Sequence, residues 1–126
     1  MLEINSNDFI YLTKGDSGTI NLTLQQGYES QAGDNIEFYV RNARNLDNIQ
    51  FALTSAGEVE GFNDNTYGTI TAVTGTTNEW TINIASLATE GMKRGKYVYD
   101  IKLHRSDNTV STFLGGGIDK LNFVVT

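Results

Sequence analysis

The chain has 126 residues, a formal net charge of −6 and neither cysteine nor proline. This length suits one domain with its own hydrophobic core, and the lack of cysteine excludes disulfides and thiolate zinc sites. The acidic balance argues against nucleic acid or an anionic membrane as a partner, and no apolar run approaches the ~20 residues of a membrane-spanning helix. Since the N-terminal residues also lack the basic and apolar regions of a signal peptide, we expect a single domain over residues 1–126 that is made in a cytoplasm.

Apolar and polar residues alternate along most of the chain, which predicts β-strands with one face toward a core. In chain order, the strand candidates are residues 9–12, 20–25, 36–41, 48–54, 69–73, 79–84, 97–104, 110–114 and 121–126. Residues 9–12 are apolar on both faces, which predicts a strand that is buried on both sides or covered by a neighbour. Residues 85–92 contain good helix formers and predict a helix of about two turns that crosses between strands.

Turn-forming residues separate these strands. Residues 14–18, with the sequence Lys-Gly-Asp-Ser-Gly, predict a hairpin loop between the first two strands. Residues 75–78 predict a second hairpin, and residues 106–108 a third turn in which Asp and Asn tolerate a positive φ. Short strands with turn signals at this spacing predict a β-sandwich or a β-barrel.

The tetrapeptide Gly15-Asp16-Ser17-Gly18 matches the residues around the nucleophile of trypsin-like proteases. That mechanism needs a histidine base and a buried aspartate that orients it. The only histidine, His104, follows the serine and shares a predicted strand face with Asp100 and Lys102, which we interpret as a solvated face. A tight loop at residues 15–18 is therefore the preferred interpretation, and we expect no enzymatic activity.

Two further segments offer oxygen ligands or positive charge. Asn63-Asp64-Asn65, with Glu58 and Glu60 nearby, could bind Ca²⁺, but the EF-hand spacing is absent. Residues 91–96 concentrate Lys93, Arg94 and Lys96, yet the spacing of a phosphate-binding loop is not met. Solvated loops are the preferred interpretation of both segments, and the triple glycine at residues 115–117 predicts a turn or bulge. We expect no metal and no cofactor.

Aromatic residues divide into two groups by their place in the pattern. Inward-facing positions are predicted for Phe38, Trp80, Tyr97, Tyr99 and Phe123. Outer or loop positions are predicted for Tyr28, Tyr39, Phe62 and Tyr67. Because a sugar-binding platform needs outward aromatics, the second group leaves a carbohydrate- or cell-surface-binding module open as an alternative function.

Three segments together resemble the N-terminal immunoglobulin-like domain of phage baseplate upper proteins and related tail-associated modules of phages and prophages. Residues 9–24 resemble its opening hairpin, and residues 34–41 resemble its next strand. The most specific segment is 95–103, which has the form Gly-x-Tyr-x-Tyr-Asp-Ile-x-Leu. A closing strand at residues 121–125 completes the pattern.

Together with the pattern of about eight or nine short strands and one short crossover helix, the resemblance implies an immunoglobulin-like β-sandwich. Its expected core contains Leu22, Phe38, Trp80, Ile82, Tyr99, Ile101 and Phe123. It also implies a non-enzymatic virion component of a tail, baseplate or neck, made in the bacterial cytoplasm, that contacts other virion proteins and leaves homo-oligomerisation open. Five polar residues are the candidate interface: Asp100, Lys102, His104, Lys93 and Arg94.

Overall fold

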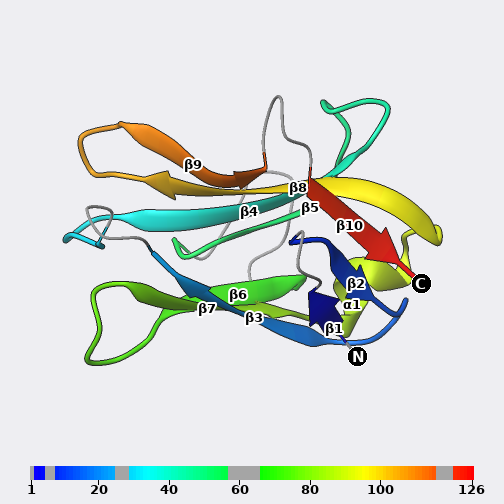
Figure 1. The fold of residues 1–126 in the computed structure, drawn as a ribbon, viewed down its shortest axis with the longest axis horizontal. Coiled ribbons are helices and arrows are strands. Elements are labelled where there is room, and N and C mark those ends of the chain that lie inside the picture. Colours follow the sequence, from blue (N-terminus) through cyan, green and yellow to red (C-terminus); the bar gives the residue numbers. More distant parts are fainter. Residues whose placement is uncertain (1, 5–7, 25–28, 57–65, 116–120) are drawn as a thin grey trace.

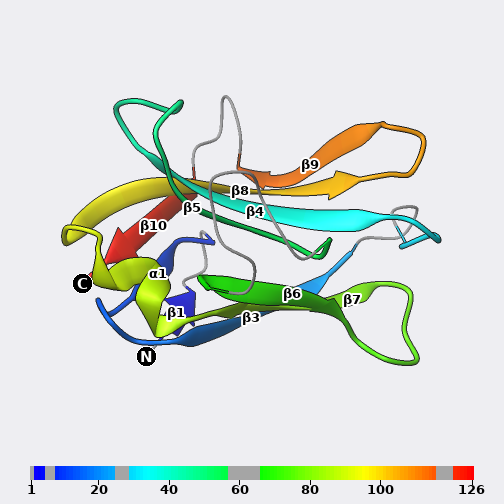
Figure 2. The same cartoon turned by 180° about the vertical axis from the view of Figure 1, so that it is seen from behind.

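A computed structural model describes residues 2–4, 8–24, 29–56, 66–115 and 121–126. These residues form two β-sheets that pack face to face as a β-sandwich, with one short helix at the end where both termini lie (Figure 1, Figure 2). The described residues contain ten strands, where the sequence predicted eight or nine, because β1 (Leu2–Ile4) was not expected.

The larger sheet has the strand order β1, β2 (Ile10–Leu12), β10 (Leu121–Val125), β8 (Gly95–His104), β4 (Asn35–Asn42) and β5 (Ile49–Thr54). A seventh strand, β9 (Val110–Gly115), pairs with the second half of β8, while β10 pairs with its first half. The smaller sheet has the order β3 (Gly18–Thr23), β7 (Glu79–Ile84) and β6 (Gly68–Ala72). Helix α1 (Ser86–Glu90) crosses from β7 to β8 as predicted.

The predicted hairpin at residues 14–18 is wrong. Strand β2 pairs with β1 and, in parallel, with β10, whereas β3 pairs with β7 in the other sheet. The loop is held to the C-terminus, where the Lys14 N–H donates to the Thr126 carbonyl at 3.0 Å. The loop therefore carries the chain between the sheets.

The other predicted turns are confirmed. Strands β6 and β7 form a hairpin, and so do β8 and β9. In the second turn Asn108 adopts a φ of 68°, a left-handed conformation that asparagine tolerates.

In β2 the expectation of burial on both faces is not met, because Ile10 and Leu12 are buried while Tyr11 is only half-buried.

The sandwich interior is built by the inward positions of both sheets. All seven residues of the expected core are buried. At its centre, the rings of Phe38 and Tyr99 are 5.7 Å apart between centroids, and Phe51 and Phe123 meet edge to face at 5.8 Å. This aromatic cluster lies between the sheets of a chain that has no cysteine for an inter-sheet disulfide.

The strand arrangement of this β-sandwich is similar to that of immunoglobulin domains. Three antiparallel strands, β3-β7-β6, pack against a sheet whose centre is β10-β8-β4-β5. Near the start of β8, directly after the crossover helix, the hydroxyl of Tyr97 donates to the carbonyl of Lys93 at 2.7 Å. This is the tyrosine corner that marks the corresponding strand in such folds.

Within the described ranges, the single helix is far too short to cross a bilayer.

Candidate functional site

Outward-facing side chains of the two central strands of the larger sheet form one cluster, which we call the β4–β8 face. Strand β4 alternates buried and half-buried residues, so Ile36, Phe38 and Val40 face the core. The antiparallel register places Tyr39 opposite Asp100, and Glu37 opposite Lys102. The face consists of Glu37, Tyr39, Arg41, Asp100, Lys102 and His104.

Asp100 lies at the centre of this face and is buried, with only 6% of its surface exposed. Its Oδ2 is 3.8 Å from Nε of Arg41 and 3.9 Å from Nζ of Lys102. Its Oδ1 is buried and has no hydrogen-bond partner among the described residues. Burial raises the pKa of this carboxyl, although the two cations act in the opposite direction. The expectation that this strip is fully solvated is therefore wrong for Asp100.

The ring of Tyr39 organises the two cations. The guanidinium carbon of Arg41 lies 4.8 Å from the ring centroid, and Nζ of Lys102 lies 5.6 Å from it. These are cation–π distances. Arg41 is fixed further because its Nη1 donates to the carbonyl of Leu46 at 3.0 Å. Burial raises the pKa of Tyr39 from 10.0 to about 12, helped by the charge of Glu37 and a hydrogen bond to it.

His104 closes one end of the face. Its Nδ1 is 3.2 Å from Oε1 of Glu37, and 40% of its side chain is exposed. The pair is a charged interaction only while the imidazole is protonated, and the surrounding solvent weakens it. Its geometry fits a surface ion pair that orients Glu37 toward the face.

The five predicted interface residues fall into two places. Asp100, Lys102 and His104 lie on the β4–β8 face, whereas Lys93 and Arg94 are exposed in the turn before β8. Arg94 is six residues from Asp100, which corresponds to about 20 Å along the strand. The turn has a structural role, because the carbonyl of Lys93 accepts the tyrosine-corner hydrogen bond.

Sequence reasoning missed the contribution of β4 to this face. The alternation of residues 36–41 already placed Glu37, Tyr39 and Arg41 on one side of a strand. What it could not supply is the pairing of β4 with β8, which brings together residues about sixty positions apart.

Ser17 and His104 do not form a catalytic pair. The loop before β3 lies beside the start of β8, because the Lys14 N–H bonds to Thr126 while Val125 pairs with Gly95. His104 is the last residue of the ten-residue β8, which places it about 30 Å from that end. The resemblance of residues 15–18 to a protease motif thus has no geometric counterpart.

The remaining sequence candidates have simple outcomes. In the part of the chain that the structure describes, no three His, Asp or Glu side chains gather around a common metal position. The proposed Ca²⁺ loop (Glu58, Glu60 and residues 63–65), the aromatics Tyr28 and Phe62, and glycines 116–117 lie outside the described residues. Tyr67 is half-buried and packs against the core, so it is not an open platform.

Comparison of the chain with protein-family models finds no match, and comparison with curated proteins finds none either.

Proposed function

We propose that this chain is a structural module of a phage or prophage virion, a tail, baseplate or neck component that acts through protein–protein contacts. The observation that carries the proposal is the β4–β8 face. It is a rigid sheet surface on which a tyrosine ring, two cations and a buried carboxylate are already held in place.

The chemistry of this face suits docking. Tyrosine and arginine are enriched at protein interfaces and carry much of their binding energy. Long cationic side chains normally lose rotamer freedom on binding, which costs conformational entropy. Stacking on Tyr39 already restricts Arg41 and Lys102, so this entropic cost of binding is smaller. Because the face contains cations (Arg41 and Lys102) and carboxylates (Glu37 and Asp100), a partner would need complementary charges of both signs, which favours a specific partner.

The sequence resemblance supports the same function. Its most specific segment, residues 95–103, is the strand that supplies Asp100 and Lys102 to the face. An aromatic sugar platform gains no support here, because two cations lie over the Tyr39 ring and a sugar could stack there only by displacing them.

The first test asks where the chain is found. Phage particles induced from a host that carries the gene are purified on a density gradient and analysed by mass spectrometry. Peptides of this chain should co-purify with tail proteins at a constant ratio. Particles that form normally without the chain would overturn the proposal, and so would a hydrolase activity that is lost on replacing Ser17 or His104.

The second test asks which surface docks. Arg41→Ala should lower incorporation into particles severalfold, because it removes the stacked guanidinium from the face. Arg44→Ala is the matched control, since Arg44 is an exposed arginine on the neighbouring loop. Equal incorporation of both variants would show that the β4–β8 face is not the docking surface.

A further inference from the structure

The outer face of the smaller sheet differs in chemistry from the β4–β8 face. Two complete cross-strand rows of residues on it contain no charged side chain. The register aligns Thr19 of β3, Asn83 of β7 and Thr69 of β6 in one row. The next row is Asn21, Thr81 and Thr71. All six residues are threonine or asparagine, although 19% of the residues of the chain are charged.

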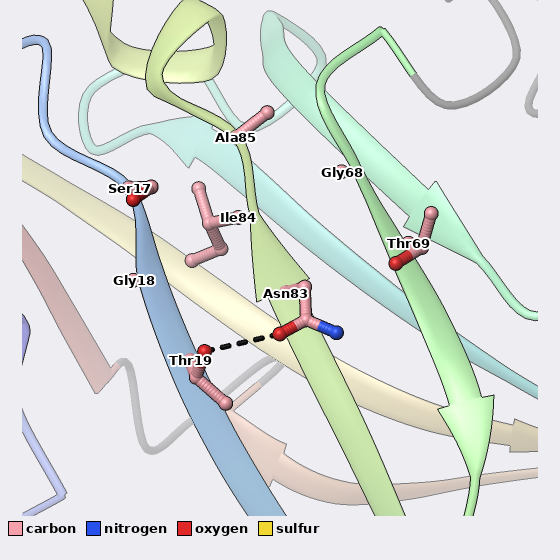
Figure 3. Close-up of a pocket in the computed structure, with 8 residues that line it drawn as sticks. All are labelled: Ser17, Gly18, Thr19, Gly68, Thr69, Asn83, Ile84 and Ala85. Atoms are coloured by element: carbon pink, nitrogen blue, oxygen red, sulfur yellow. Dashed lines mark hydrogen bonds between the residues drawn. The ribbon is translucent and has the colours of Figure 1, made fainter.

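The first row borders a hollow of about 450 Å³ at the end of this sheet (Figure 3). Its lining is formed by Ser17, Gly18, Thr19, Gly68, Thr69, Asn83, Ile84 and Ala85. None of these side chains is titratable or aromatic. The volume falls within the ~300–1,000 Å³ of small-molecule sites.

Hydrogen bonding fixes the polar groups of the hollow. The hydroxyl of Thr19 donates to Oδ1 of Asn83 at 3.0 Å, which sets the orientation of the amide. The amide nitrogen therefore lies on the side of Thr69, whose hydroxyl faces it in Figure 3. The structure gives neither that nitrogen nor the Thr69 hydroxyl a partner among the described residues. Two donors thus face the hollow, and their positions are set by a rigid sheet and a stiff β-branched side chain.

We propose that this hollow binds a neutral saccharide unit through the Asn83 amide and the Thr69 and Ser17 hydroxyls. A charged ligand would give up its hydration without meeting an opposite charge, since the lining has none. The Asn83 amide and the Thr69 and Ser17 hydroxyls can each donate a hydrogen bond, and the two protein hydroxyls can also accept one. These groups match a ligand that carries several adjacent hydroxyls. Without an aromatic platform, affinity for one unit lies in the millimolar range. The site is independent of the β4–β8 face, which belongs to the other sheet.

The test is a titration of the ¹⁵N-labelled chain by NMR. The probes are D-glucose, D-galactose and N-acetyl-D-glucosamine, with D-galacturonate as the charged counterpart. At least one neutral sugar should shift the backbone amides of residues 17–19, 68–69 and 83–85 in a saturable way, and galacturonate should not. Absence of saturable shifts with all three neutral sugars would overturn the proposal.

A matched pair of variants on one strand separates binding from general surface effects. Thr69→Val removes a lining hydroxyl and keeps the side-chain shape, so the dissociation constant should rise about fivefold, the worth of one hydrogen bond. Thr71→Val makes the same change outside the hollow on the same outer face and should leave it unchanged. Equal effects of the two variants would overturn the proposal, as would shifts that depend on protein concentration alone, which would assign the surface to self-association.

Discussion

The tyrosine corner provides the sharpest test of how this sandwich is held together. Tyr97 is 9% exposed, and its hydroxyl donates to the carbonyl of Lys93 at 2.7 Å. Tyr97→Phe removes only this hydrogen bond and keeps the ring in the core. Because the bond is only part-buried and Lys93 is exposed, we expect a water molecule to replace the hydroxyl at this carbonyl.

The expected loss in unfolding free energy is therefore about 1 kcal/mol, the net value of one such bond. For a domain of this size, that corresponds to a decrease in Tm of about 3–5 °C. Tyr97→Ala removes the buried ring as well and should cost about 3–5 kcal/mol.

Urea unfolding measures both variants, with fluorescence of Trp80 as the signal, because this single tryptophan is buried in the opposite sheet. The dependence of the unfolding free energy on urea should be the same for Tyr97→Phe and the unaltered chain. Equal unfolding midpoints for these two proteins would refute the tyrosine-corner argument. A loss as large as that of Tyr97→Ala would refute it too, since the ring and not the hydroxyl would then be misplaced.

Three further changes test other features. Burial raises the pKa of Asp100 above 3.8. The contribution of this group to stability is therefore fully present below its unfolded-state pKa and is lost as pH rises through its folded-state pKa. Asp100→Asn should flatten this fall in stability, which urea unfolding at a series of pH values measures. Tyr39 should ionise at about pH 12 instead of 10.0, so stability declines over that interval, and Glu37→Gln should lower this pKa in an ultraviolet titration. Gly68→Ala should cost about 3 kcal/mol or more, because φ is +144° and a Cβ would overlap a neighbouring carbonyl, whereas Gly75→Ala, at φ +86° in open space, should cost about 1 kcal/mol in the same unfolding assay.

The inward residues could be predicted from the sequence because alternation is a local property. Once Phe38 is assigned to the core, the neighbouring positions in the strand must face out. This is why the expected core is confirmed and why the β6–β7 and β8–β9 hairpins are found where turn residues indicated them.

Strand partners could not be predicted in the same way. Residues 14–18 have the composition of a hairpin loop, but the same residues suit any sharp reversal. The choice between pairing β2 with β3 and pairing it with β10 depends on contacts with the far end of the chain, such as the hydrogen bond from Lys14 to Thr126. A local pattern contains no information about that contact.

Burial of Asp100 was missed for a related reason. Its outward position follows from alternation, but its burial depends on Arg41 and Tyr39, which approach from β4 through the cross-strand register. An outward residue is solvated only if its cross-strand neighbours are small or extended away from it. Here the neighbours are long and stacked, so an outward carboxylate becomes a buried one.

The structure also explains why residues 95–103 are distinctive. Tyr97 closes the tyrosine corner, the hydroxyl of Tyr99 donates to the carbonyl of Asp8 at 2.6 Å, and Ile101 is in the core. These three residues and the buried Leu103 therefore maintain the sandwich, whereas Asp100 and Lys102 of the same segment reach the outer face. What distinguishes this chain from another sandwich of the same topology must then be its two outer faces. One is charged and aromatic and the other is neutral and hydroxyl-rich, so a single partner chemistry cannot suit both.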